Sequence, residues 1–450
     1  MKTLKNIGKI ALLSLALCGG TTSCNYLDVV PPEQASLPDA TKDPESTLGF
    51  LFSCYGGIRN PFDYQTVEAG ADEYVLPPLW NTGSQKITWD LNLPTNIADG
   101  WSWGSNYRFI GQCLLFLQQL PHARGVTDEQ KRAWAAEANF LLAYYHMVTL
   151  VAYGPCPITD TYIDQATPES EYNGRMHFDY VKDWICQKFD EVCEDGQLPA
   201  TRTGDEWGRA TSVMAKALKA RLLVYAASPL FNGSFPYKDW ENTNFETPGY
   251  GKELISPKYD RKKWEVAKAA CQEAITAAEA AGHKLFSLED AQSLYQQAGL
   301  PLPFVPFKSA EGGTADKDKE FMERVQLMRY VVTTRYKEGN RETIWGLANQ
   351  GTMIIGSLPH RVIKNNQGTW KSGYSGVSPT LNTVERFYTE NGVPIEKDNQ
   401  FYPQSEWYQS AGVTDRSDII KLNTRREPRF YAWIAFDGGD MGSRIYGGQP

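Results

Sequence analysis

A short run of tryptophan and amide side chains near residue 100 has the residue types that could bind a ligand. Trp101, Trp103 and Asn106 stand just before a segment predicted to be helical over Tyr107–Leu120. A Trp ring can stack on the apolar C–H face of a sugar, and an amide can exchange hydrogen bonds with its hydroxyl groups. The run therefore suits reversible capture of a carbohydrate, although the two Trp rings could instead cap the core.

A second group of aromatic residues lies in the C-terminal half. Trp370 and Tyr374 are interleaved with Gly, Ser and Asn between residues 350 and 380, a composition typical of a surface loop. These two rings could contact a ligand or pack against the body of the protein.

No motif for enzymatic chemistry or for a cofactor is present in the sequence. The five His residues lack the spacing of the H-E-x-x-H zinc motif, and no G-x-S-x-G, P-loop or G-x-G-x-x-G pattern occurs. A glycoside hydrolase needs only two carboxylates, so that class of enzyme stays open. We predict a non-catalytic protein without metal or cofactor.

The chain is acidic, with a formal net charge of −8. Loss of residues 1–23 would remove Lys2, Lys5 and Lys9 and no acid, and would bring the charge to −11. No basic patch is visible that could neutralise phosphates, so nucleic acid is excluded as a partner.

Residues 1–23 have the pattern of a lipoprotein signal peptide. A basic start is followed by the apolar run Ile10–Leu17, which is too short to span a bilayer. Small residues then precede Cys24, which we predict to be lipidated and to begin the mature protein. Thr21 stands where the lipidation motif usually has Leu, so ordinary secretory cleavage is the alternative.

The rest of the chain is predicted to consist of a tether and one domain. Residues 24–45 are polar and rich in proline, which favours an extended tether. Residues 46–450 are predicted to form a single helical domain with loop insertions. The six cysteines after Cys24 are interpreted mostly as buried thiols, since they show no C-x-x-C spacing.

Helices must position these candidate residues. Residues 128–153 repeat apolar side chains at the helical period, follow Thr127 as an N-cap and stop at Gly154 and Pro155. This helix is apolar on most of its surface, so we expect it at the centre of the fold. Further helices are expected over Ser46–Ile58, Phe178–Cys193, Ala210–Tyr225, Trp264–Ala281 and Leu381–Thr389, with an exposed loop at Asp316–Glu320 and a short strand at Glu342–Trp345.

Several blocks of the sequence resemble the SusD/RagB family of outer-membrane nutrient-binding lipoproteins. The longest block is E-A-N-F-L-L-A-Y-Y-H-M-V-T-L-V-A-Y-G-P-C-P-I, at Glu137–Ile158. G-R-A-T at Gly208–Thr211, N-G-V-P-I at Asn391–Ile395 and R-R-E-P-R-F-Y at Arg425–Tyr431 follow in the family's order. The resemblance implies a mainly α fold, namely a degenerate tetratricopeptide-like scaffold of helical pairs with long irregular loops and a few short strands.

The resemblance also implies a function. Family members bind oligosaccharides at the cell surface and pass them to a SusC-like TonB-dependent transporter in the outer membrane. Trp103 and Asn106 have the W-x-x-N spacing of the glycan-contacting pair in the family's starch-binding founder, and Asp72 stands where an acidic contact is expected. A peptide-binding lid of a similar transporter, a helical glycoside hydrolase and a protein-binding scaffold are the alternatives.

The family usually continues past the R-x-P-R-F-Y block with a further helical segment. This sequence ends at Gly447-Gly448-Gln449-Pro450, so we expect the domain to lack its C-terminal end.

Overall fold

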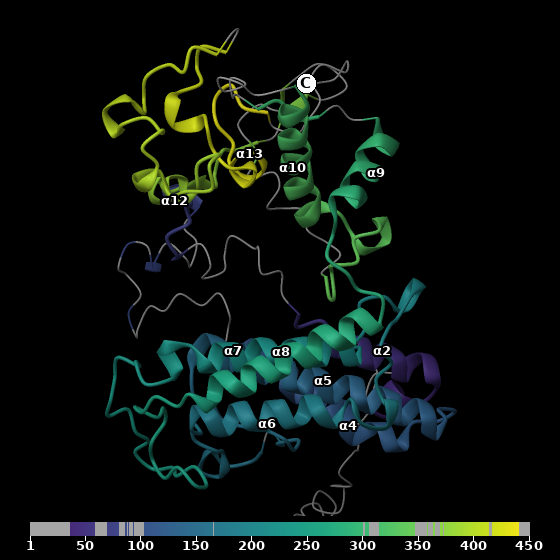
Figure 1. Cartoon of the computed structure of the whole chain (residues 1–450). Coiled ribbons are helices and arrows are strands. Elements are labelled where there is room, and N and C mark those ends of the chain that lie inside the picture. Colours follow the sequence, from purple (N-terminus) through teal and green to yellow (C-terminus); the bar gives the residue numbers. More distant parts are fainter. Residues whose placement is uncertain are drawn as a thin grey trace, which may run out of the picture.

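The protein is mainly α-helical, as the sequence predicts, and its helices form two parts (Figure 1). The computed structural model describes residues 37–58, 70–80, 86–87, 89, 93, 103–164, 166–299, 302–305, 315–346, 358, 363–364, 370–371, 373–413 and 416–440. Cys24 and Trp101 lie outside these residues. None of the helices in the described ranges combines the length and the apolar character of a membrane span.

The first part, called the helical body below, is a layered array of helices in the lower half of Figure 1. Neighbours in sequence pack side by side, from α4 on α5 through α5 on α6 and α6 on α7 to α7 on α8, which is the tetratricopeptide-like arrangement. The helices are α2 (Pro44–Tyr55), α4 (Trp103–Gln119), α5 (Asp128–Tyr153), α6 (Phe178–Glu191), α7 (Ser212–Ala227) and α8 (Lys262–Ala280).

Helix α5 is the centre of the helical body, as predicted. Thr127 and Gln130 form a capping box at its start, and Gly154 ends it with a positive φ of 69°. Phe140, Leu141 and Leu142 are fully buried in the main hydrophobic core, together with side chains of every other helix of the body. The pattern read from the sequence therefore gives both ends of this helix correctly.

The second part, called the C-terminal part, contains α9 (Leu288–Ala298), α10 (Ala315–Thr333), α12 (Leu381–Arg386) and α13 (Pro428–Trp433). It has separate small cores, one of them built around Val325 of α10 and Phe430 and Tyr431 of α13. Two short antiparallel sheets belong to it: β1 (Tyr74–Val75) pairs with β4 (Ser378–Pro379), and β2 (Ile363–Lys364) pairs with β3 (Trp370–Lys371).

Two local predictions are wrong. The charged run Asp316–Glu320 lies within α10, not in a loop, because the helix buries Val325 against α13 while Lys317, Lys319 and Glu320 stay exposed. The segment Glu342–Trp345 is not a strand. Its side chains fix it instead: the Glu342 carboxylate accepts from the Phe286 N–H (2.9 Å), and the Trp345 indole donates to the Gly208 carbonyl (2.9 Å).

Structured residues are also described before position 46, where the single domain is predicted to begin. Residues Leu37–Thr41 form the 3-10 helix η2, and the Arg124 N–H donates to the Thr41 carbonyl (3.0 Å). Residues 24–36 lie outside the described residues, so the extended tether over residues 24–45 stays a prediction. The six cysteines from Cys54 to Cys271 are free thiols, and four of them are buried, in agreement with the prediction.

Two buried imidazoles make the stability of the helical body sensitive to acid. The N–H of Thr159 donates to Nε2 of His146 (3.1 Å), and Nδ1 lies 2.8 Å from the Leu142 carbonyl, so the neutral ring satisfies both contacts. His177 stacks on Tyr250 with ring centroids 3.9 Å apart. Burial lowers the pKa of each imidazole to about 4.

We expect the free energy of unfolding to fall as pH drops from about 6.5 to about 4, because in this range the two imidazoles are protonated in the unfolded state and stay neutral in the folded state. Each imidazole contributes up to about 1.4 kcal/mol per pH unit in that window. Urea denaturation at pH 7.5, 6.0 and 5.0 would measure the slope. His177→Asn keeps an N-cap acceptor for α6 and should reduce the dependence of the unfolding free energy on pH. His122→Gln is the control, because His122 is exposed and its loss should leave that dependence unchanged. An equal pH dependence in the wild-type protein and both variants would show that His177 is not a source of the acid sensitivity.

Candidate functional site

A pocket rich in aromatic side chains lies where α5 and α7 end. Its volume is about 800 Å³, and its walls come from the last turn of α5, from α7 and from the loop that follows α7. The lining residues are Val151, Ala152, Tyr153, Gly154, Tyr225, Leu230, Phe231, Phe235, Tyr237, Lys238, Asp239 and Trp240. Six of them are aromatic, which suits a ligand with flat apolar faces and polar edges.

Helix-terminating residues explain why α5 and α7 both end at the pocket. Gly154 and Pro155 end α5, and Ser228 with Pro229 ends α7 and starts the 3-10 helix η9 (Pro229–Phe231). Asn232 then fixes the loop. Its buried amide donates to the carbonyls of Ala227 (3.2 Å) and Asp260 (3.0 Å), and its side-chain oxygen accepts from the Asp260 N–H (2.7 Å). These bonds fix the start of the loop that forms the pocket wall.

The loop after Asn232 carries an aromatic wall. The Phe235 and Trp240 rings are stacked, with centroids 5.7 Å apart and planes 12° apart. Tyr237 meets Phe235 edge-on at 5.9 Å and is 71% exposed. The wall therefore offers accessible aromatic surface beside two charged side chains, Lys238 and Asp239.

Arg175 connects this wall with the predicted residue Trp103. Its guanidinium carbon lies 4.8 Å from the Trp103 ring centroid and 5.8 Å from that of Trp240. Nη1 of Arg175 donates to the carbonyls of Pro155 (2.5 Å) and Tyr153 (3.3 Å). Arg175 thus contacts both Trp103 at the start of α4 and Trp240 of the aromatic pocket.

The structure brings Trp103 and Asn106 together at the start of α4, where they pack against α5. The backbone N–H of Trp103 donates to the Tyr153 hydroxyl (3.0 Å), and the centroid of its ring lies 5.1 Å from that of Tyr107. Asn106 is 4% exposed, and its amide donates to the Thr149 hydroxyl (3.1 Å). Contact of either residue with a ligand stays a prediction.

The other predicted residues lie in or beside the C-terminal part. The Asp72 carboxylate accepts from the Asn382 amide (2.6 Å) and lies 3.5 Å from Arg386 of α12, so its described contacts do not involve Trp103 or Asn106. Tyr374 is 63% exposed, and Trp370 belongs to β3. Their contact with a ligand also stays a prediction.

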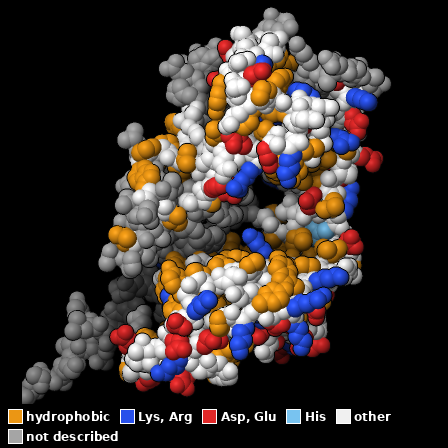
Figure 2. All heavy atoms as spheres, turned by 60° about the vertical axis from the view of Figure 1, so that its left-hand side comes forward, with side chains coloured by type: hydrophobic (Ala, Val, Ile, Leu, Met, Phe, Trp, Pro, Cys, Tyr) orange, Lys and Arg blue, Asp and Glu red, His pale blue; other side chains and the backbone are white. Residues whose placement is uncertain are grey.

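Figure 2 shows hydrophobic side chains gathered on the helical body along the edge of a hollow that faces the C-terminal part. In the loop after α7, Leu230 and Tyr237 are large exposed apolar side chains that line the aromatic pocket.

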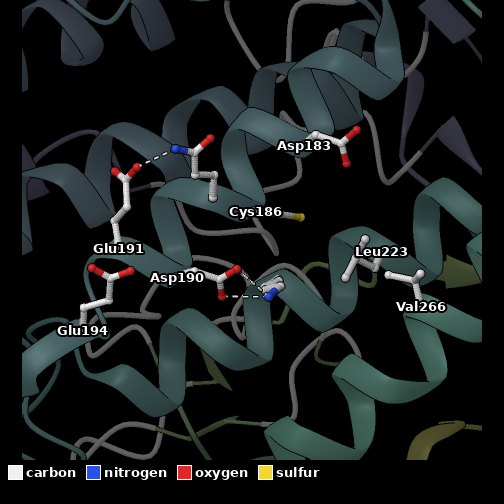
Figure 3. A pocket seen from close by; sticks show the side chains of 9 residues that line it. Asp183, Cys186, Asp190, Glu191, Glu194, Leu223 and Val266 are labelled. Atoms are coloured by element: carbon white, nitrogen blue, oxygen red, sulfur yellow. Dashed lines mark hydrogen bonds and ion pairs between the residues drawn. The ribbon is translucent and has the colours of Figure 1, made fainter.

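A second, acidic depression of about 510 Å³ lies between α6, α7 and α8 (Figure 3). Its carboxylates are held by neighbours: Asp190 accepts from Lys219 (2.7 Å), and Glu191 accepts from Lys188 and Gln187 (both 2.8 Å). Partial burial opposes ionisation of Glu191, but these hydrogen bonds hold its pKa below the ordinary value. A glycosidase acid needs a raised pKa, so Glu191 does not suit that role.

The sequence analysis did not select the wall residues Phe235, Tyr237 and Trp240. Their signal is compositional, since F-P-Y-K-D-W at Phe235–Trp240 places three aromatic residues within six positions, mixed with Pro, Lys and Asp. Such a run has neither helical nor strand period, so it gives no indication of which helices it lies against.

Comparison with known proteins agrees with this architecture. The sequence model of the SusD family matches residues 328–448, which include the N-G-V-P-I and R-R-E-P-R-F-Y blocks, and solved SusD-like proteins share the fold. The chain belongs to the SusD family. A search of the curated proteins gave no match.

Among the solved structures that resemble this chain, BT4246 is 54% identical to it, with a TM-score of 0.81 over 88% of this chain and 66% of that one. The SusD-like protein BF3747 of Bacteroides fragilis NCTC 9343 is 18% identical, with a TM-score of 0.58 over 89% of this chain and 62% of that one. The SusD-like carbohydrate-binding protein BF0978 of the same strain is 16% identical, with a TM-score of 0.53 over 87% of this chain and 59% of that one. The chain thus spans just under two thirds of the length of BT4246.

Proposed function

We propose that this SusD-family protein is a non-catalytic glycan-binding protein of the cell surface that captures oligosaccharides at the aromatic pocket. The observation that carries the proposal is the wall of Phe235, Tyr237 and Trp240, an aromatic surface beside polar side chains. Sugar rings would stack on these faces, and Lys238, Asp239 and backbone groups would meet their hydroxyls.

Capture serves uptake in this proposal. The protein delivers the oligosaccharide to a SusC-like TonB-dependent transporter, and lipid on Cys24 holds it at the outer membrane. Acyl chains on one cysteine can anchor a protein without a membrane-spanning helix. Family membership supports this placement.

Trp240→Ala is expected to weaken oligosaccharide binding at least tenfold, because the Trp240 face and its stack with Phe235 are lost. Isothermal titration calorimetry against a panel of neutral and acidic oligosaccharides and peptides would measure the change. Trp264→Ala is the matched control: Trp264 is 42% exposed on α8 and does not line the pocket, so its loss should leave binding unchanged.

Other outcomes separate the alternatives. Binding that survives Trp240→Ala but is lost in Tyr374→Ala or Trp103→Ala would keep the function and move the site to the residues predicted from sequence. Binding of peptides alone would favour a peptide-binding lid. Release of new reducing ends from a bound polysaccharide by the purified protein would identify a glycoside hydrolase.

A further inference from the structure

The guanidinium of Arg175 is only partly used by the protein. Nη1 donates to the carbonyls of Pro155 and Tyr153, and these are the hydrogen bonds that the guanidinium makes among the described residues. Nε and Nη2 have no partner there, and neither is among the buried side-chain atoms that lack one. The Nε–Nη2 edge, with its pair of parallel N–H groups, therefore reaches solvent.

The charge of Arg175 also lacks a carboxylate partner. No Asp or Glu of the described residues lies within ion-pair distance of it. Two other largely buried arginines of the helical body differ in this respect, because Arg202 and Arg209 both contact Glu137. A half-buried cation without an anion binds an incoming anion more strongly than a solvated surface cation would.

The position of Arg175 is fixed before any ligand arrives. The Trp103 and Trp240 rings lie on it at 4.8 and 5.8 Å, and two backbone carbonyls hold Nη1. Arg175 is not itself a lining residue, but Trp240 and Tyr153 line the pocket, so the guanidinium contacts two residues of the pocket wall. The charged residues of the lining, Lys238 and Asp239, have opposite signs, so the neighbouring Arg175 adds a positive charge that no lining residue balances.

We propose that the aromatic pocket recognises glycans that carry a carboxylate, as uronic and sialic acids do. The Nε–Nη2 edge of Arg175 binds the carboxylate through two parallel hydrogen bonds, and the sugar ring rests on the aromatic wall. This inference rests on the proposed function and names the ligand class of the same site.

Trigalacturonic acid and its fully methyl-esterified form are a suitable pair of probes, because they share their rings and linkages and differ in charge. Calorimetry at low salt should show about 10- to 100-fold tighter binding of the acid form, as expected for paired charge-assisted hydrogen bonds. Added NaCl should weaken only the acid form. Sialyllactose against lactose tests the same chemistry on a second acidic sugar.

Arg175→Lys keeps the positive charge and removes the pair of parallel N–H donors, so the preference for the acid form should fall several-fold without being lost. Arg175→Gln should bring the ratio close to one while the ester still binds. Arg261→Gln is the control, since Arg261 is a highly exposed arginine of the helical body, and it should keep the wild-type ratio. The ratio in the wild-type protein alone decides the inference if an Arg175 variant fails to fold.

The possible failures are distinguishable. Equal binding of acid and ester by the wild-type protein overturns the inference and leaves glycan capture intact. A preference for sulfated over carboxylated sugars, or for peptide carboxylates over both, also overturns it. Absence of binding to every glycan by the folded protein removes the proposed function as well.

Discussion

Replacing Glu137 by Gln should lower the free energy of unfolding by about 3–5 kcal/mol. Glu137 of α5 is completely buried, and its carboxylate accepts hydrogen bonds from the Tyr55 hydroxyl (2.6 Å), from Arg202 (3.0 Å) and from two nitrogens of Arg209 (2.5 and 3.0 Å). The amide keeps the shape but removes the negative charge, so Arg202 and Arg209 lose their buried anion and keep only the half-exposed Glu206 as a common partner.

Urea denaturation followed by circular dichroism would measure this loss. Glu273→Gln is the matched control, because Glu273 pairs with Lys216 on the surface and is 51% exposed. Exposed pairs contribute about 0–1 kcal/mol, so the control should unfold close to the wild-type midpoint. Equal midpoints for the two variants would show that the Glu137 network contributes no more than a surface pair.

Arg426→Met should destabilise the C-terminal part by at least about 3 kcal/mol, because each buried carbonyl left without a donor costs about 1–3 kcal/mol. Arg426 is completely buried and donates to the carbonyls of Val384 (2.5 Å), Phe387 (2.8 Å) and Leu422 (3.0 Å). Burial lowers its pKa to about 10, yet the side chain stays protonated at neutral pH.

Hydrogen exchange resolved by mass spectrometry would locate this effect. Peptides that cover residues 381–388 and 420–433 should exchange faster in Arg426→Met, while those of α5 and α7 keep their protection. Arg429→Met is the control in the same sequence block, since Arg429 is 47% exposed and pairs with Glu427. Faster exchange in both variants, or in neither, would rule out a special role for the buried arginine.

The sequence predicts the helical body well because its helices carry local signals. Thr127 and Gln130 cap α5, Gly154 ends it, and the apolar period between them is long. The early start of α4 at Trp103 lacked such a signal, because the aromatic and amide residues there are equally compatible with a loop.

Contacts between distant parts of the chain decide the elements that the sequence missed. Trp345 and its neighbours have the residue types of a strand, yet the Trp345 ring fills a space against Phe140 and Tyr144, more than 200 residues earlier. The charged start of α10 reads as a solvated loop until Val325 is seen packed against α13. Local propensity cannot encode either contact.

In the candidate site too, the sequence indicates some residues by their type, while others are identified only by long-range contacts. Trp103 was selected for its residue type, and the structure does place it beside an aromatic pocket. The wall itself, and the cation that connects Trp103 with it, come from Arg175 and the loop after α7, which are brought together by the turn at Asn232 and by the end of α5. No sequence spacing predicts that Arg175 contacts both Trp103 and Trp240.

The Glu137 network also constrains the order in which the chain can fold. Its partners are far away along the sequence: Tyr55 is 82 residues from Glu137, Arg202 is 65 and Arg209 is 72. Until the segment around Arg209 has been synthesised and has docked, α5 would have to bury a carboxylate without a cation. We therefore expect α5 to dock only together with the segments around Tyr55 and Arg209, so that a nascent chain that stops short of Arg202 gains little stability from this helix.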